Sequence, residues 1–136
     1  MTDKPLQRVQ KFHQTFGVDA PDEPTIPTAE ICALRIALIQ EELNELKEAF
    51  ENKDIIEVAD ALGDLSVVVD GSYDVCGLAP YKESLSKEIF DSNMSKLDEN
   101  GKPIYREDGK VLKGPNYFKP DIAKVLGTDP EHKDAA

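Results

Sequence analysis

Two groups of carboxylates stand out in the sequence because of their spacing. Glu41, Glu42 and Glu45 lie close together, and Glu57 and Asp60 follow after a short spacer. Acids three residues apart share one face of a helix, so two adjacent helices with such pairs can surround a cation with oxygen atoms. Oxygen ligands suit the hard ions Mg²⁺ and Mn²⁺ and argue against zinc, copper or a thiolate cluster. The spacing therefore indicates a divalent-metal site.

The helical positions of the first group separate these acids from an ordinary solvated face. On a helical wheel, Glu42 falls inside the apolar arc, and Glu41 and Glu45 line its margin. Glu48 points toward solvent on the same wheel, so we expect its replacement by alanine to leave activity unchanged. The wheel predicts that part of this acidic group is withdrawn from water.

The second group continues as a stripe of Glu57, Asp60 and Asp64, and no Lys or Arg occurs between Asp54 and Tyr81. A carboxylate withdrawn from water pairs with a cation, binds a metal or takes up a proton at a raised pKa. Glu57 has a competing role, because Asp54-Ile-Ile-Glu57 is also a capping box for a helix. We favour the metal role for Glu57.

The histidines restrict the kind of metal chemistry. The sequence has two of them, His13 and His132, and neither lies in the Glu-x-x-His motif of di-iron carboxylate bundles. Protein-bound Mg²⁺ completes its shell with water and substrate phosphate. The acidic half of the chain thus suggests phosphate-ester or polyphosphate chemistry.

Helices must position these acids, and caps and breakers indicate their limits. Helix-breaking glycines and prolines and the capping residues Thr28 and Asp54 mark the boundaries. The predicted helices cover about residues 4–16, 28–52, 54–76 and 80–96. We predict a single all-α domain over residues 1–136. It consists of a four- to five-helix bundle at about 4–96, an irregular C-terminal arm at about 97–126 with one hairpin turn at Asp108-Gly109, and a flexible acidic tail at 127–136.

Charge and hydropathy exclude several classes of protein. The net charge is −11, which argues against binding to a nucleic-acid backbone. No stretch approaches the roughly 20 apolar residues of a membrane span, and no signal-peptide pattern is present, so we expect a cytoplasmic protein. Residues 1–81 carry 16 acidic and 6 basic side chains, whereas residues 82–124 carry 8 and 9. This asymmetry is consistent with a metal region beside an anion-binding region.

At this point the chain resembles a known family. The pattern E-E-x-x-E, a spacer and E-x-x-D, followed by Leu62-Gly63-Asp64, is similar to that of the MazG-like all-α nucleotide pyrophosphohydrolases. The segments Asn93-Met94-Ser95-Lys96 and Asp108-Gly109-Lys110 through Gly114 resemble the short branch related to dimeric dUTPases and phosphoribosyl-ATP pyrophosphohydrolase. The resemblance covers about residues 5–122. It implies Mg²⁺-dependent cleavage of a nucleoside triphosphate between its α and β phosphates.

The resemblance also implies roles for individual acids. Glu42, Glu45, Glu57 and Asp60 are the expected metal ligands, with Mn²⁺ able to replace Mg²⁺. Glu41 is expected to act as a supporting group or as the general base, and Asp64 to join a second ion.

Residues outside the acidic groups are expected to bind substrate. Arg35, two turns before Glu42, is expected to hold a carboxylate by an ion pair or to reach a phosphate. Asn93 offers an amide that can form hydrogen bonds with the base or the ribose. For Lys110 and Lys113, an exposed position in water without a substrate contact is the competing interpretation. The remaining expected contacts are Lys96, Lys110 and Lys113 with the polyphosphate and Tyr117 with the base.

Three functions remain open from the sequence. The first is a house-cleaning nucleoside triphosphate pyrophosphohydrolase that acts on noncanonical or deoxynucleotides, with dUTP as one candidate. The second is a phosphoribosyl-ATP pyrophosphohydrolase, and the third is a noncatalytic helical module that binds Mg²⁺ or a partner chain. Because Val67 and Leu62 lie on different sides of the third helix, a single bundle cannot cover all its apolar surface. We therefore expect at least a homodimer.

Overall fold

The structure is a computed structural model that describes residues 4–127, and over this range it is all-helical. The expected acidic tail therefore lies outside the described residues, apart from Gly127. The chain divides into two compact units, the first ending at Pro80 and the second beginning at Tyr81. No helix in the described range is both long enough and apolar enough to cross a membrane.

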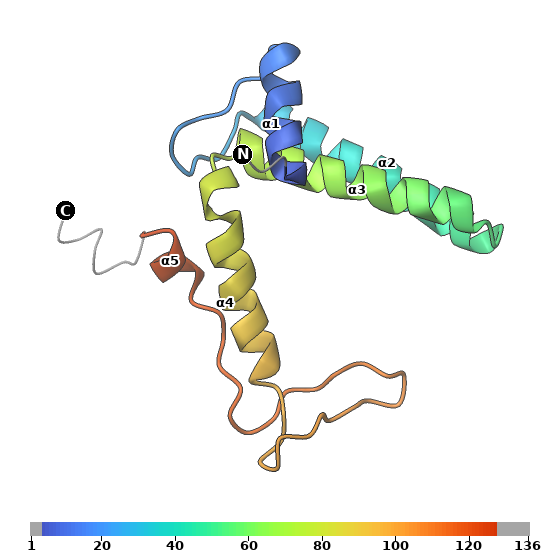
Figure 1. Ribbon diagram of the computed structural model, residues 1–136, viewed down its shortest axis with the longest axis vertical. Helices are drawn as coiled ribbons and strands as arrows, with labels where there is room; N and C mark the ends of the chain where they lie inside the picture. The colour runs from blue at the N-terminus through green and yellow to red at the C-terminus, as the bar shows by residue number, and fades with distance from the viewer. Residues whose placement is uncertain (1–3, 128–136) are drawn as a thin grey trace. The chain divides into compact units, whose positions relative to one another are not determined.

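The first unit contains the long helices α2 (Ala29–Glu51) and α3 (Ile55–Val75), which lie side by side (Figure 1). Both begin where the sequence predicts. The Thr28 hydroxyl accepts the Ile31 N–H at 3.3 Å, and the Asp54 carboxylate accepts the Ile56 N–H at 3.0 Å. Each cap satisfies an amide that the first helical turn leaves without a partner. The short connection makes the two helices antiparallel, so their acidic segments lie opposite one another.

The helix α1 (Pro5–Thr15) packs against α3. The Nδ1 atom of His13 lies 2.6 Å from Oδ2 of Asp74, and both side chains are buried. The loop after α1 returns along the end of α3, where the Thr25 N–H donates to the Cys76 carbonyl at 2.9 Å. Gly77 has φ +69° there, and a Cβ at this position would overlap the Glu23 carbonyl. The α1 helix is thus held in place by polar contacts as well as by packing.

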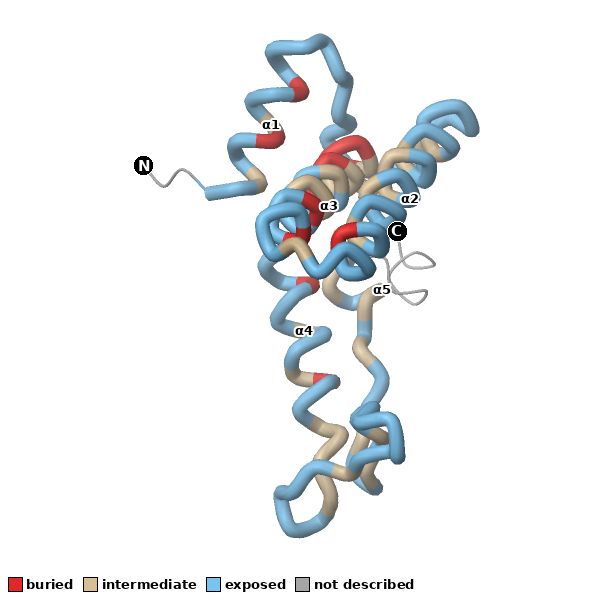
Figure 2. Tube along the Cα trace, turned by 90° about the vertical axis from the view of Figure 1, so that its right-hand side faces the viewer, coloured by how far each residue is buried: buried red, intermediate tan, exposed pale blue. Residues whose placement is uncertain are grey.

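Few residues are buried, as the short red segments in Figure 2 show. Phe12 and Phe16 have the helical spacing that is typical of core residues, but neither belongs to the core. Their rings stack on each other with centroids 4.4 Å apart, but the residues are 55% and 68% exposed. Helical spacing identifies the apolar side of α1, but that side extends beyond the surface that α3 covers. The buried apolar residues in the described range are Val9, Ala49, Val58, Ala61, Val75 and Leu85.

The second unit is built on α4 (Lys82–Met94), which a short 3-10 turn over Ala79–Tyr81 precedes. The returning chain is attached to α4 by hydroxyl groups. The Ser92 hydroxyl donates to the Phe118 carbonyl at 2.8 Å, and the Phe118 N–H donates to the Ser95 hydroxyl at 3.1 Å. The segment ends in the one-turn helix α5 (Ile122–Val125), which packs on α4.

The C-terminal arm contains the predicted hairpin turn. Tyr105 and Val111 form an antiparallel bridge, and the Arg106 N–H donates to the Lys110 carbonyl at 2.8 Å. Gly109 has φ +89°, a conformation that glycine adopts without steric cost. The arm is nevertheless less irregular than the sequence predicts, because it also contains α5.

Candidate metal centre

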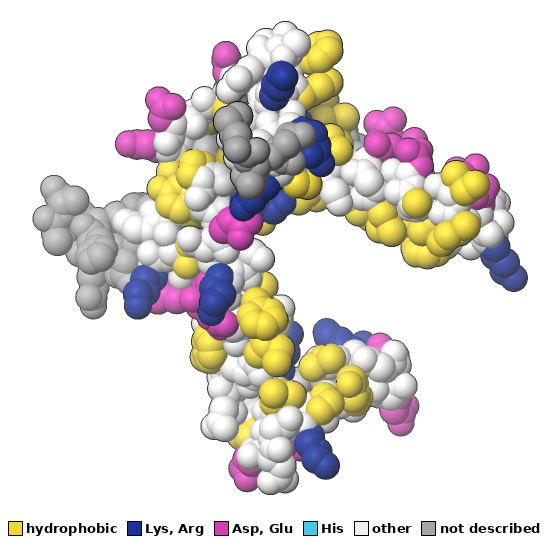
Figure 3. All heavy atoms as spheres, in the orientation of Figure 1, with side chains coloured by type: hydrophobic (Ala, Val, Ile, Leu, Met, Phe, Trp, Pro, Cys, Tyr) yellow, Lys and Arg dark blue, Asp and Glu magenta, His cyan; other side chains and the backbone are white. Residues whose placement is uncertain are grey.

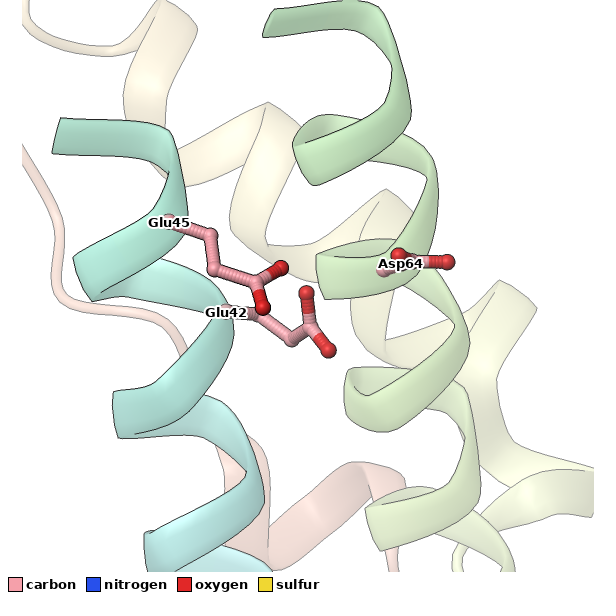
Figure 4. A group of neighbouring side chains, drawn as sticks. All are labelled: Glu42, Glu45 and Asp64. Carbon is pink, nitrogen blue, oxygen red and sulfur yellow. The ribbon is translucent and has the colours of Figure 1, made fainter. Parts of the chain in front are cut away.

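Three of the expected acids converge between α2 and α3. Glu42, Glu45 and Asp64 each offer a carboxylate oxygen, and these oxygens all lie within 4.8 Å of one another. In Figure 4, Glu42 and Glu45 project from α2 toward α3, which carries Asp64. The Glu42 and Asp64 residues are half-buried and Glu45 is exposed, so the group is open to solvent on one side.

Glu42 is the member of this group with the least favourable surroundings for a negative charge. Its Oε2 atom is buried and has no hydrogen-bond partner, and no other side-chain polar atom in the described range is in this position. Burial raises the pKa of the Glu42 carboxyl. The negative charges of Glu45, Asp64 and Glu41 raise this pKa further. A buried acceptor atom among like charges is suited to a cation.

A second group of acids lines a cleft beside the first. Glu45, Glu48, Glu57 and Asp60, together with Asn52 and Ala61, surround a volume of about 320 Å³. Glu45 belongs to both groups and connects them. The five expected metal ligands are thus divided between two adjoining groups of oxygens on the same helix pair.

Glu48 is a candidate that the sequence analysis did not identify. The side chain is exposed, as the helical wheel of α2 predicts, yet it lines the same cleft as Glu57 and Asp60. The helical wheel of α2 shows which of its residues lie near its apolar side. It does not show which of them lie next to residues of another helix. The i, i+3 spacing of Glu45 and Glu48 is the signal that was available.

The structure separates the two roles considered for Glu57. Asp54 caps α3 and also accepts the Glu57 N–H at 3.2 Å. In a full capping box Glu57 would accept the Asp54 N–H. That N–H donates instead to the Ala49 carbonyl at 3.2 Å. Asp54 therefore caps the helix without the Glu57 carboxylate, which is left to line the cleft.

Glu41 is exposed and does not belong to either group of converging oxygens. Its charge nevertheless contributes to the raised pKa of Glu42. It therefore acts electrostatically on the cluster from its margin, where the helical wheel places it.

Arg35 lies along the same helix pair but has different partners from those expected. Its Nη2 donates to the Val68 carbonyl at 2.7 Å, and its Nε donates to the Ser72 hydroxyl at 3.1 Å. Burial lowers the pKa of the guanidinium, and the negative charge of Asp74 opposes this. These hydrogen bonds make Arg35 a link between α2 and the C-terminal half of α3.

The other expected substrate contacts lie in the second unit. Asn93 and Lys96 line a cavity of about 360 Å³ at the end of α4. The Nζ of Lys113 lies 4.9 Å from the centre of the Tyr117 ring, and the Lys110 side chain is exposed on the hairpin. The face of an aromatic ring attracts an ammonium group electrostatically, so the Tyr117 ring helps to position Lys113.

Residues 9–92 match the family of phosphoribosyl-ATP pyrophosphohydrolases, and this segment is more than half of the chain. The chain belongs to the phosphoribosyl-ATP pyrophosphohydrolase family. It is therefore a pyrophosphohydrolase enzyme, which confirms the resemblance to the MazG-like enzymes and argues against a noncatalytic module. The phosphoribosyl-ATP pyrophosphohydrolase match includes all of the expected metal ligands but ends before Asn93.

No curated protein matches the sequence significantly. A solved structure called a "putative NTP pyrophosphohydrolase", from Exiguobacterium sp. 255-15, is similar over 100% of this chain and 100% of its own, with 23% identity and a TM-score of 0.48.

Proposed function

We propose that this pyrophosphohydrolase is Mg²⁺-dependent and cleaves a nucleoside triphosphate between its α and β phosphates, releasing a monophosphate and pyrophosphate. The observation that carries the proposal is the unpartnered Oε2 of Glu42 within a group of converging carboxylates. Noncanonical or deoxynucleotides, including dUTP, are the proposed substrates, and the proposed location is cytoplasmic.

The residues fit a hard divalent cation. The donor atoms are carboxylate oxygens from Glu42, Glu45 and Asp64, with Glu57 and Asp60 in the adjoining cleft. Histidine and cysteine are absent from both groups, which disfavours softer metals. Bound Mg²⁺, or Mn²⁺ in its place, would neutralise charge on the triphosphate and acidify the attacking water.

The task of the chain's own side chains in this reaction is to take up the proton of the attacking water. We assign this proton to a carboxylate that does not hold the cation, and the candidate is the exposed Glu41, whose other possible role is to support the cluster. The water oxygen forms a new bond to one of the two phosphorus atoms, α or β, while the bond between that phosphorus and the oxygen that bridges the α and β phosphates breaks. Pyrophosphate leaves, and the monophosphate remains.

Positive charge is needed to bring the substrate to such an acidic chain. We assign the polyphosphate contacts to Lys96, Lys110 and Lys113, and the base or sugar contacts to Asn93 and Tyr117. Lysines are flexible point charges that adapt to phosphate oxygens.

The family match supports a second substrate, phosphoribosyl-ATP. This compound carries the same triphosphate, so the acidic groups would serve it equally. The two candidates differ only in what is attached to the phosphates.

We also propose that the enzyme is at least a homodimer. Apolar residues are exposed along the helix pair, and Figure 3 shows them on the edge of this pair opposite its acidic side chains. On α2 they include Ile36, Leu43 and Phe50, spaced by seven residues, and on α3 they include Leu62 and Val69. Contiguous exposed apolar surface of this kind marks a protein interface.

Pyrophosphate release from a panel of substrates tests the reaction. The panel contains the common ribo- and deoxynucleoside triphosphates, dUTP and phosphoribosyl-ATP, each assayed with Mg²⁺, with Mn²⁺ and with EDTA. We expect release from at least one nucleoside triphosphate that requires the cation. Release from phosphoribosyl-ATP alone would assign the second substrate. Unchanged release in EDTA would contradict the metal site.

A further inference from the structure

The two cysteines of the sequence, Cys32 and Cys76, are far apart along the chain but lie at the same end of the α2–α3 pair. Cys32 is near the start of α2, and Cys76 directly follows the last residue of α3. The short connection between the two helices is at the other end of the pair (Figure 1). Both cysteines are half-buried thiols that form no disulfide, and nothing in the proposed reaction uses them.

The contacts between α2 and α3 place the two cysteines in facing positions. Arg35 of α2 donates to the Ser72 hydroxyl of α3 at 3.1 Å. In an antiparallel pair, one turn toward the start of α2 corresponds to one turn toward the end of α3. Cys32 lies one turn before Arg35, and Cys76 lies one turn after Ser72, whose carbonyl accepts the Cys76 N–H at 3.2 Å. The cysteines are therefore the next facing positions beyond the contact between Arg35 and Ser72.

The segment that leads into α2 contacts both cysteines from another side. The Thr25 N–H donates to the Cys76 carbonyl at 2.9 Å, and the Cys32 thiol donates to the Pro27 carbonyl at 3.5 Å. A chain spans at most roughly 7 Å over the two steps from Thr25 to Pro27. The same short stretch thus holds Cys32 and Cys76 near each other.

The two sulfurs also influence each other electrostatically. Burial raises the pKa of the Cys76 thiol, a negative charge on Cys32 raises it further, and the charge of Arg35 opposes both effects. A protein disulfide is a strong oxidant where the reduced pair is stabilised as a thiolate. The raised pKa of Cys76 denies the reduced pair this stabilisation, so a bridge between the two residues would not be easily reduced.

We propose that Cys32 and Cys76 are a modification site, at which a low-molecular-weight disulfide such as oxidised glutathione forms a reversible bridge between α2 and α3. The thiolate of one cysteine attacks a glutathione sulfur, forms a mixed disulfide and releases the first glutathione thiolate. The thiolate of the other cysteine attacks the protein sulfur of this mixed disulfide, forms the bridge and releases the second glutathione. The two cysteines are oxidised, the glutathione disulfide is reduced, and the two thiol protons pass to the released glutathione molecules.

The bridge closes the helix pair at the end where no chain connection joins it. The residues between Cys32 and Cys76 include all the proposed metal ligands, from Glu42 to Asp64. A cross-link stabilises a protein mainly by constraining its unfolded chain, and the effect grows with the length of the closed loop. We therefore expect the oxidised protein to resist unfolding better than the reduced protein does.

Equilibration of the full chain with mixtures of reduced and oxidised glutathione tests the bridge. Mass spectrometry of peptides prepared without reduction should show the Cys32 and Cys76 peptides joined, and non-reducing electrophoresis should show that the bridge lies within one chain. The Tm should rise by about 10 °C on oxidation and fall again with dithiothreitol. Cys32→Ser and Cys76→Ser should each abolish this rise.

A variant with one thiol moved is the matched control. Cys32→Ser combined with Ala33→Cys keeps the number of cysteines and turns one thiol by about 100° around α2, to an exposed position. Disulfide geometry is specific, so this pair should need about tenfold more oxidised glutathione to form a bridge. Equal bridging of the two pairs would overturn the inference. So would unreacted thiols in excess oxidised glutathione, glutathione retained on the cysteines without a bridge, or a bridge only between two chains.

Discussion

The guanidinium of Arg35 occupies the space in which a side chain on Gly71 would stand. This contact joins the start of α2 to the C-terminal half of α3, because the same guanidinium donates to the Val68 carbonyl and the Ser72 hydroxyl. His13 lies against the same glycine. The absence of a side chain at residue 71 thus lets three helices meet.

Replacing each glycine of α3 by alanine should have opposite effects on stability. Gly63→Ala should stabilise the protein by about 1 kcal/mol, because alanine favours the helix and meets no neighbour. Gly71→Ala has the same helical advantage but displaces Arg35 from its acceptors. A hydrogen bond from a charged group contributes roughly 1.5–3 kcal/mol, so we expect Gly71→Ala to be the less stable variant by about that amount.

Urea unfolding of the two variants measures this difference directly. Each variant is the control for the other, since the substitution and the helix are the same. Equal free energies of unfolding for Gly63→Ala and Gly71→Ala would show that the Arg35 contact adds nothing to stability.

The raised pKa of Glu42 predicts how stability depends on pH in the absence of metal. Because the folded-state pKa lies above the unfolded value, the folded protein binds more protons between the two values. Stability is therefore lost as pH rises from about 4.3, the ordinary glutamate pKa, through the raised pKa of Glu42. We expect Glu42→Gln to flatten this part of the pH profile and to make the metal-free protein more stable at pH 7.

Thermal or urea unfolding between pH 4 and pH 8 in EDTA provides the test. Added Mg²⁺ should stabilise the unmodified protein at pH 7 and have a smaller effect on Glu42→Gln. A parallel pH profile for the two proteins would contradict the assigned position of Glu42 among like charges.

Substitutions of the individual carboxylates should lower kcat/KM to different extents. Glu42→Gln, Glu45→Gln, Glu57→Gln and Asp60→Asn should each lower kcat/KM by more than the roughly 10–100-fold seen for groups that only support a metal ligand. Glu45 belongs to both groups of oxygens, so its variant should be the most severe.

Glu48 and a distant acid complete this series. Glu48→Gln, which the sequence alone predicts to be harmless, should weaken activation by Mg²⁺ roughly tenfold because Glu48 lines the cleft. Glu51→Gln, at the end of α2 and outside both groups, is the control and should be unchanged. Mg²⁺ titrations of the pyrophosphate release rate distinguish these outcomes. If Glu57→Gln and Glu51→Gln have the same activity, the cleft is not the site.

Local interactions within a helix can be predicted from the sequence, whereas contacts between helices cannot. The starts of α2 and α3 were predictable because Thr28 and Asp54 cap their own first turns, which is a local interaction. The partners of Arg35 were not, because Val68 and Ser72 are more than 30 residues away and lie on another helix. Helical periodicity fixes the rotation of a helix about its axis. It does not say how much of the exposed side a neighbour covers.

The same limit applies within the candidate site. The i, i+3 spacing correctly brought Glu42 and Glu45 to one side of α2. It did not reveal that Glu48 shares a cleft with Glu57, since that depends on how the two helices are rotated relative to each other. It also did not predict that the Ala49 carbonyl, by accepting the Asp54 N–H, would leave the Glu57 side chain out of the cap.

The exposed apolar stripe of α2 predicts the oligomeric state. Leu43 and Phe50 line a shallow groove, and a second copy of the chain would remove them from water. Sedimentation at micromolar concentration should show a dimer or larger assembly, and Phe50→Asp should weaken it. Gln40→Asp, at the polar side of the groove, tests whether charge alone has this effect. A monomeric unmodified protein would contradict the proposed assembly.

The lysines of the hairpin should act on substrate capture. An anionic triphosphate approaches a chain of net charge −11, so nearby positive charges increase the rate of productive encounter. Replacing Lys110 and Lys113 together by glutamate should raise KM by about tenfold, with a smaller effect at high salt. The fold of the hairpin should survive, because the Tyr105–Val111 bridge and the ion pair between Arg106 and Asp108 do not involve the lysine side chains.

Net charge needs a separate control, because the double variant makes the chain more acidic everywhere. Lys102→Glu combined with Lys119→Glu changes the charge equally at two other exposed lysines of the second unit. Steady-state kinetics at two salt concentrations compare the pairs. If both pairs raise KM equally, the effect belongs to net charge and the hairpin lysines do not contact the polyphosphate. If only the Lys110 and Lys113 pair raises KM while kcat is kept, their charges act before the chemical step, where binding of the triphosphate requires them.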